Sequence, residues 1–172
     1  LFSQHSNFTP LRLAALLTQL PEPRSRRLRG HTTIKGVTMR VRGATLADRD
    51  AVCKICLETG DAGDDATADY PVDPQALGKR WAVPYLELEP EFAFVIEDEG
   101  GAVCGYAFGA LDTAKFAARL QAEYLPKLRA THADPAASGA PESEWTSEQK
   151  LYHEYHDASA GAAPPAVADE YP

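Results

Sequence analysis

Residues 39–52, MRVRGATLADRDAV, decide how the fold begins, because a strand pattern passes within a few residues into a helix pattern. Residues 40–44 favour a short β-strand, with Val41 on one face. Thr45 is then a suitable N-cap, and Asp48 places an acid in the first turn, where it complements the helix dipole. The helix should run to about Glu58. Its apolar stripe, at i, i+3 and i+4, is formed by Val52, Ile55 and Cys56.

The second informative stretch is residues 92–111, FAFVIEDEGGAVCGYAFGAL. Residues 92–96 predict a largely buried strand, and Gly100 and Gly101 favour a tight turn because glycine tolerates positive φ. A second strand should then cover residues 102–111. Side chains alternate between the two faces of a strand. One face should therefore carry Cys104, Tyr106, Phe108, Ala110 and Asp112.

The rest of the chain predicts helices around this hairpin. Residues 74–81 favour one helix, and apolar residues at i+4 spacing mark another that Pro126 breaks or restarts: Phe116, Leu120 and Tyr124. Residues 147–158 favour a short helix after a flexible loop at 133–146. The order strand, helix, helix, hairpin, helix, loop, helix predicts an α/β (α+β) domain, and 172 residues suit one such domain.

Charge divides the chain into two unlike parts. The chain has 17 basic and 25 acidic residues, of which six basic residues and one acidic residue precede Met39. From Met39 onward, 11 basic and 24 acidic residues remain, which gives this part a net charge of −13. An acidic domain repels nucleic acid and suits cationic partners such as amines. No stretch approaches the roughly 20 apolar residues of a membrane span. Three cysteines argue against a disulfide framework, so we expect a cytoplasmic protein without membrane or nucleic-acid partners.

Residues 1–38 have a different character. A short apolar run is followed by the arginine-rich residues 24–29. Such a segment is compatible with an organelle transit sequence or with an arm that binds phosphates. Met39, the only methionine, starts a new pattern in clean register, so we favour a basic leader without a fold of its own.

Three motifs suggest metals but fit poorly. Cys53 and Cys56 have CxxC spacing, yet they lie on the apolar stripe of a helix without a second pair, which favours core cysteines. The alternating acids of residues 61–69 lack the glycine and the glutamate that a calcium loop requires. His153 and His156 are three residues apart, whereas HExxH places its histidines four apart. We therefore expect no metal site.

Two stretches together resemble the GNAT acetyltransferases. Residues 39–52 look like the family's first strand and helix, and residues 92–110 look like its second and third strands, where a GxVvGy step recurs. Four further stretches resemble the acetyltransferase-like domain at the C-terminus of O-GlcNAcase and its stand-alone bacterial relatives: 84–92, 103–112, 124–129 and 147–151. The resemblance covers about residues 39–172.

The resemblance implies a mainly antiparallel sheet flanked by helices and continued by a fourth and fifth strand. Between these strands a loop of the form (R/Q)xxGx(G/A) binds the pyrophosphate of acetyl-CoA, as helix N-termini bind anions. No segment of this sequence has that form. We therefore expect a fold truncated before the cofactor-binding strands, with residues 39–158 as the front portion of the domain and 159–172 as a linker. Such a portion should be inactive by itself.

The intact protein is then expected to transfer acetyl from acetyl-CoA to a small-molecule or peptide amine. The alternative is a non-catalytic binding module of the O-GlcNAcase type. Asp112, at a strand end, is the candidate for acceptor binding or for a base that acts through water, and it is equally suited to capping a helix that begins near Thr113. Tyr85 and Tyr106 are candidates for the acceptor wall, although tyrosines are more often core or rim residues.

Overall fold

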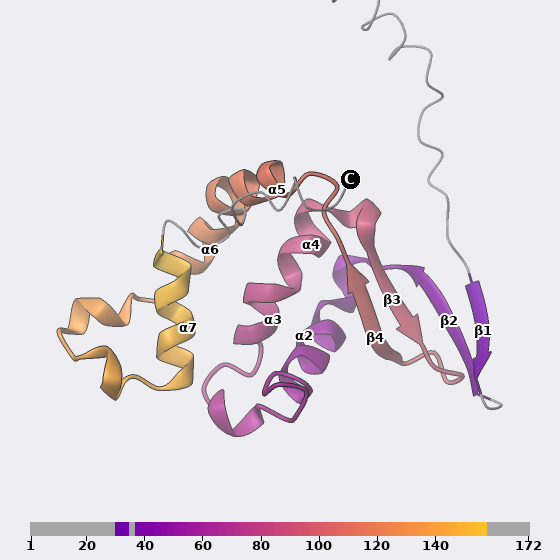
Figure 1. The fold of residues 1–172 in the computed structure, drawn as a ribbon, viewed down its shortest axis with the longest axis horizontal. Helices are drawn as coiled ribbons and strands as arrows, with labels where there is room; N and C mark the ends of the chain where they lie inside the picture. The colour runs from indigo at the N-terminus through magenta and orange to yellow at the C-terminus, as the bar shows by residue number, and fades with distance from the viewer. Residues whose placement is uncertain (1–29, 35–36, 158–172) are drawn as a thin grey trace, which may run out of the picture.

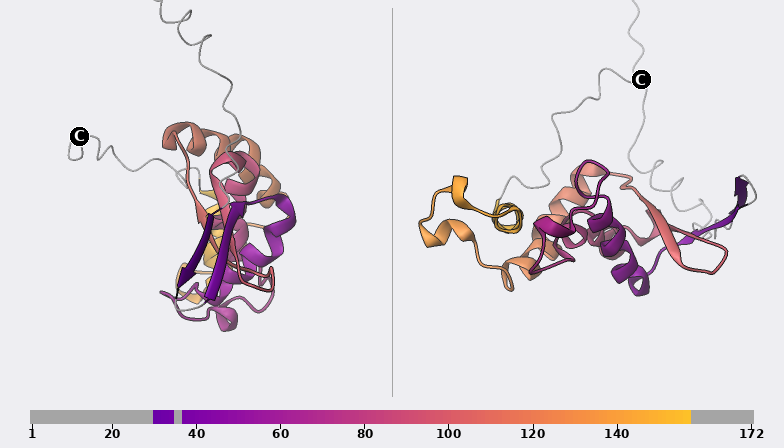
Figure 2. Two further views of the ribbon diagram at one scale, coloured as in Figure 1. Left: turned by 90° about the vertical axis from the view of Figure 1, so that its right-hand side faces the viewer. Right: turned by 90° about the horizontal axis from the view of Figure 1, so that it is seen from below.

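The computed structural model describes residues 30–34 and 37–157. The first 29 residues of the expected leader and the expected linker, 159–172, lie outside the described residues. Within the described part, a β-sheet occupies one end of the molecule, and helices extend from it to the opposite end, where α7 lies (Figure 1). The view from below shows the same elongated arrangement, whereas the view from the β1 end looks along the length of the molecule (Figure 2).

The sheet is antiparallel and has the strand order β1-β2-β3-β4. Its strands are β1 (Gly30–Ile34), β2 (Val37–Gly43), β3 (Ala93–Glu97) and β4 (Val103–Phe108). The antiparallel sheet expected from the sequence is confirmed. The first expected strand begins earlier than residue 40, and its outer edge pairs with β1, so that part of segment 1–38 belongs to the sheet.

The helices follow the expected order with one addition. They are α2 (Arg49–Glu58), α3 (Ala76–Trp81), α4 (Val83–Leu88), α5 (Thr113–Arg119), α6 (Leu125–Arg129) and α7 (Ser147–His156). Helix α4 was not expected, because Pro84 interrupts the helical pattern. In the structure Pro84 lies in the first turn of α4, where its missing N–H costs nothing.

Shorter helical turns connect these elements. They are η1 (Leu46–Asp48), η2 (Thr67–Asp69), η3 (Pro90–Phe92), the π-helical η4 (Leu120–Tyr124), η5 (Pro135–Ser138) and η6 (Glu142–Glu144). The π-helical turn joins α5 directly to α6, so the expected break becomes a restart, with Pro126 in the first turn of α6. The expected loop 133–146 contains η5 and η6.

The opening stretch folds around an ion-pair network. Asp48 accepts hydrogen bonds from the backbone N–H and the hydroxyl of Thr45, at 2.8 and 3.0 Å. Arg42 donates two hydrogen bonds to the same carboxylate, at 2.6 and 2.8 Å, and its Nε lies 2.5 Å from Glu97 Oε1. Arg42 therefore ties β2 to the start of α2 and to β3.

Helices α2 and α3 approach one another unusually closely. A Cβ placed on Gly78 of α3 would lie 2.5 Å from the Cα and the Sγ of Cys53 on α2. Only glycine fits at this contact without a shift of one helix. Cys53 itself is 1% exposed, so the close contact belongs to the core that the helices form with β3.

A β-bulge changes the expected alternation on β4. The register between β3 and β4 shifts after Ile96, so that Glu97 pairs with Val103 and Ile96 with Gly105. Val103, Tyr106 and Phe108 therefore pack against the core, whereas Cys104 is exposed. The expectation that Cys104 shares a face with Tyr106 was wrong, because strict period-two alternation does not allow for the extra residue.

Candidate functional site

Four aromatic rings lie in a continuous stack where β4, α4 and α5 meet. We call them the aromatic row: Tyr106, Phe108, Tyr85 and Phe116. The ring centroids of Tyr106 and Phe108 are 4.7 Å apart, those of Phe108 and Tyr85 5.8 Å, and those of Tyr85 and Phe116 4.5 Å. Neighbouring planes differ by 14–19°, which is the geometry of stacked rings. The structure thus brings together Tyr85 and Tyr106, the two tyrosines expected at an acceptor wall.

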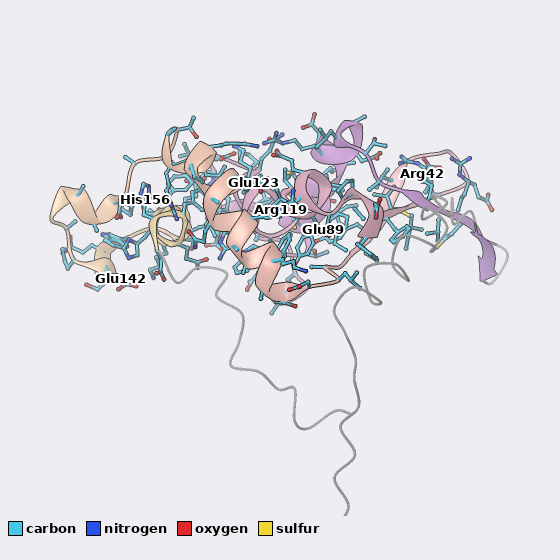
Figure 3. The ribbon with its side chains drawn as sticks, turned by 90° about the horizontal axis from the view of Figure 1, so that it is seen from above. Arg42, Glu89, Arg119, Glu123, Glu142 and His156 are labelled. Atoms are coloured by element: carbon cyan, nitrogen blue, oxygen red, sulfur yellow. The ribbon has the colours of Figure 1, made fainter. Side chains whose placement is uncertain are left out.

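The row is fixed from both ends. Tyr106 Oη lies 3.0 Å from Cys56 Sγ, which connects β4 to α2. On the other side, Arg119 of α5 donates a 2.6 Å hydrogen bond to the carbonyl of Leu88, at the end of α4, and its Nε lies 3.1 Å from Glu123 Oε1. Figure 3 shows Arg119 between Glu89 and Glu123. Helices α4 and α5 are therefore held together where they present Tyr85 and Phe116.

Burial keeps the hydroxyl of Tyr106 protonated. Removal from water raises the pKa of Tyr106, and the hydrogen bond to Cys56 raises it further. The pKa of the Cys56 thiol is itself raised, mainly by burial. A neutral phenol is a poor general base. Tyr106 is therefore suited to be part of a wall and not to accept a proton.

Asp112 follows β4 and caps α5. Its Oδ1 accepts a 3.0 Å hydrogen bond from the backbone N–H of Lys115, and its Oδ2 lies 3.0 Å from Lys115 Nζ. The backbone hydrogen bond, together with the lysine, lowers the pKa of Asp112. The capping role is thus present in the structure. A part for Asp112 in acceptor binding or proton transfer stays a prediction.

Two residues of the row were not expected at the site. Phe108 and Phe116 complete the stack, and Phe108 separates the two tyrosines. Phe108 shares a strand face with Tyr106, which was a usable signal. Phe116 was recognised only as a helix-face residue, because no pattern along the chain indicates that α5 packs beside α4.

The residues considered for metals have other partners. Cys53 and Cys56 are buried in the core, as their helix positions predict. His153 Nδ1 lies 2.8 Å from Asp134 Oδ1, and His156 Nε2 lies 2.8 Å from the carbonyl of His132. Among residues 30–34 and 37–157, no three or more histidine, cysteine or acidic side chains are grouped to hold a metal ion.

The described helices offer no cradle for the diphosphate of a nucleotide. Such a cradle needs open backbone N–H groups at a helix N-terminus. Asp48 occupies the turn before α2, Asp112 caps α5, and Thr146 caps α7 through a 3.2 Å hydrogen bond from Gln149 N. Helices α3 and α4 have six residues each. The capped N-termini of α2, α5 and α7 therefore do not fit a pyrophosphate group. In the same part of the chain, no helix is both long and apolar enough to cross a membrane.

Comparison with known proteins finds relatives in sequence and in structure but no matching family model. No protein-family model matches the chain. Protein O-GlcNAcase of Rattus norvegicus is 27% identical over 110 residues, which are 64% of this chain and 11% of that protein, and the Mus musculus protein gives the same values. The chain thus spans about a tenth of the length of these relatives. The solved structure of SsHAT matches with a TM-score of 0.62 and 32% identity, over 73% of this chain and 59% of that one.

Proposed function

We propose that this chain supplies the amine-acceptor side of an acetyl-transfer site. Its sequence is O-GlcNAcase-like and its fold is GNAT-like, so the chain forms an acetyltransferase-like domain. The aromatic row carries this proposal, because it places Tyr85 and Tyr106 in one stack at the end of β4. The acceptor is a small-molecule or peptide amine. The acyl donor that the GNAT likeness implies is acetyl-CoA.

The chemistry of the site suits binding of an amine. Tyr85, Tyr106 and Phe108 are half-buried, so their rings offer an apolar surface beside solvent. The acidic character of residues 39–172 also raises the local concentration of cations.

Asp112 provides the charge in this proposal. A carboxylate with a lowered pKa stays ionised at neutral pH, so it can pair with the ammonium form of an acceptor. Transfer requires the neutral amine, so the ammonium form of the acceptor must first release one proton to a base. Asp112 accepts that proton through water, after the carboxylate exchanges its contact with Lys115 for the acceptor.

A non-catalytic binding module is the second candidate. The observation that favours it is that the protein's own side chains cap α2, α5 and α7, so the N-termini of these three helices offer no open N–H groups to a nucleotide diphosphate. The aromatic row would then bind an amine-bearing ligand without turnover.

One experiment separates the candidates. The chain is incubated with acetyl-CoA and a panel of amines that includes a lysine peptide, and products are measured by mass spectrometry while amine binding is followed by NMR. Acetylated product above the protein-free rate supports transfer. Binding without product supports amine binding at the site and the role of a binding module for this chain by itself, and the absence of both binding and product rejects the two candidates together.

Two variants test whether Tyr85 and Asp112 take part in amine binding. Tyr85→Ala should weaken amine binding, whereas Tyr152→Ala, which removes a half-buried tyrosine on α7, should not. Asp112→Asn keeps a good N-cap and removes only the charge, so stability should hold while amine binding falls. Unchanged amine binding in Asp112→Asn would leave Asp112 with the capping role alone.

A further inference from the structure

A hollow of about 470 Å³ lies among α2, α3, α4 and α6, apart from the aromatic row. Cationic side chains reach it from three helices, and a histidine lies at its edge: Arg49, Lys79, Lys127 and His132. We propose that this hollow binds a phosphate-type oxyanion, either inorganic phosphate or the phosphate group of a small metabolite.

The close contact between α2 and α3 brings the first two cations together. Arg49 lies one helical turn before Cys53, and Cys53 touches Gly78, the neighbour of Lys79. The charges of Arg49 and Lys79 both act on the Cys53 thiol and lower its pKa slightly against the larger effect of burial, which raises it. The glycine contact thus places one charge from each helix on the same side of the pair.

Tyr124 forms part of the wall. Its side chain is 2% exposed, and its hydroxyl donates a 2.6 Å hydrogen bond to the carbonyl of Lys79. Burial and the nearby Glu87 raise the pKa of Tyr124, whereas Arg49 lowers it. The charges of Glu87 and Arg49 therefore both act on the hydroxyl of Tyr124. Lys127 Nζ is 5.8 Å from the centre of the ring. The wall at Tyr124 is therefore a neutral aromatic surface, which adds no negative charge to the hollow.

The positive charges are only partly balanced. Lys79 Nζ lies 2.7 Å from Asp73 Oδ2, and Lys127 Nζ lies 2.6 Å from Glu87 Oε2. Within the described residues, Arg49 has no hydrogen-bond or ion-pair partner for its side chain. A guanidinium presents paired donors that match two oxygens of a phosphate. Arg49 is therefore the cation best placed to anchor an oxyanion.

Lys127 can leave Glu87 and bind the anion with little loss of folding stability. Its side chain is 61% exposed, and its pair with Glu87 is a surface salt bridge, which contributes little to stability. His132 forms part of the rim and has partners for both ring nitrogens, with Nδ1 3.0 Å from the carbonyl of Leu128 and Nε2 3.3 Å from Asp73 Oδ2. The hollow thus carries one cation without an ionic partner among the described residues, Arg49, and one in an exposed salt bridge, Lys127, within a chain of net negative charge.

The test measures phosphate binding to the full chain by NMR titration, with sodium chloride at matched ionic strength as reference. The wild-type protein should show saturable shifts for amides around the hollow, including residues 124–132. Arg49→Gln should weaken phosphate binding about tenfold, as the loss of a charge-assisted pair predicts. Lys54→Gln removes a charge from the exposed face of the same helix and should leave the affinity unchanged within about twofold.

Several outcomes would overturn the proposal: shifts equal to those in chloride, shifts spread over the whole surface, or equal weakening by Arg49→Gln and Lys54→Gln. If Arg49→Gln fails to fold, the location of the wild-type shifts decides. Glycerol 3-phosphate in parallel identifies the source of the anion. Tighter binding than inorganic phosphate indicates a metabolite, and equal binding indicates the free ion. Amine binding at the aromatic row should be unaffected by Arg49→Gln.

Discussion

Replacing Asp48 by asparagine tests the ion-pair network that begins the fold. Asp48 is 8% exposed and accepts hydrogen bonds from Arg42 and Thr45. These contacts, above all those from Arg42, lower the pKa of Asp48 from 3.8 to about 2. Asparagine keeps the size of the side chain but cannot pair with the guanidinium. It also leaves Arg42 half-buried, with Glu97 as its remaining ionic partner.

The pKa shift sets the size of the effect. Lowering the pKa of Asp48 from 3.8 to about 2 corresponds to about 2 kcal/mol of folding free energy at neutral pH. Because the folded-state pKa is lowered, this contribution is complete above the unfolded-state value of 3.8. It is lost as the pH falls through about 2. The stability difference between wild type and Asp48→Asn should therefore be about 2 kcal/mol at pH 7 and roughly half of that at pH 3.

Urea denaturation, followed by circular dichroism between pH 7 and pH 3, measures this difference. Asp50→Asn is the matched control, since Asp50 lies two residues further along, in the first turn of α2, is exposed and should change stability by less than about 0.5 kcal/mol. An Asp48→Asn protein within about 0.5 kcal/mol of wild type at pH 7 would refute the reasoning. A difference that stays constant down to pH 3 would refute it as well.

Three further outcomes follow from the packing. Gly78→Ala should cost about 1–3 kcal/mol in urea denaturation, because its Cβ would meet the backbone of Cys53, whereas Gly43→Ala, with open space around its Cβ, should cost clearly less. Thr146→Ala should cost about 1 kcal/mol by the same measurement, since α7 loses its capping box. Mass spectrometry after brief iodoacetamide treatment should find Cys104 alkylated first, because burial raises the pKa of both other thiols, that of Cys53 to about 11.

Local signals predicted the elements that depend on neighbouring residues. Thr45 and Asp48 indicated the start of α2 because a capping interaction spans three residues. The double glycine indicated the β3–β4 hairpin, since Gly101 does adopt a positive φ of 83°. The bulge at Cys104 escaped prediction, because an extra residue in one strand is defined only by its pairing with the other strand.

The candidate site was predictable only in part. Tyr85 and Tyr106 were singled out through resemblance, and their common stack depends on Phe108 between them. The contribution of Phe116 depends on how α5 lies beside α4, which Arg119 fixes by a contact across 31 positions of the chain. The cationic hollow was likewise not visible along the sequence. It arises where Gly78 lets two helices approach, and no spacing rule relates Arg49 to Lys79.

Strand β1 bears on how this protein should be produced for experiments. A shortened version that starts at the lone methionine, Met39, would lose β1 and the first two residues of β2. The backbone edge of β2 that now pairs with residues 30–34 would then be open to other chains, and open strand edges promote aggregation. Expression should therefore start upstream of Gly30, and poor solubility of a Met39 version would be a sign of the missing strand.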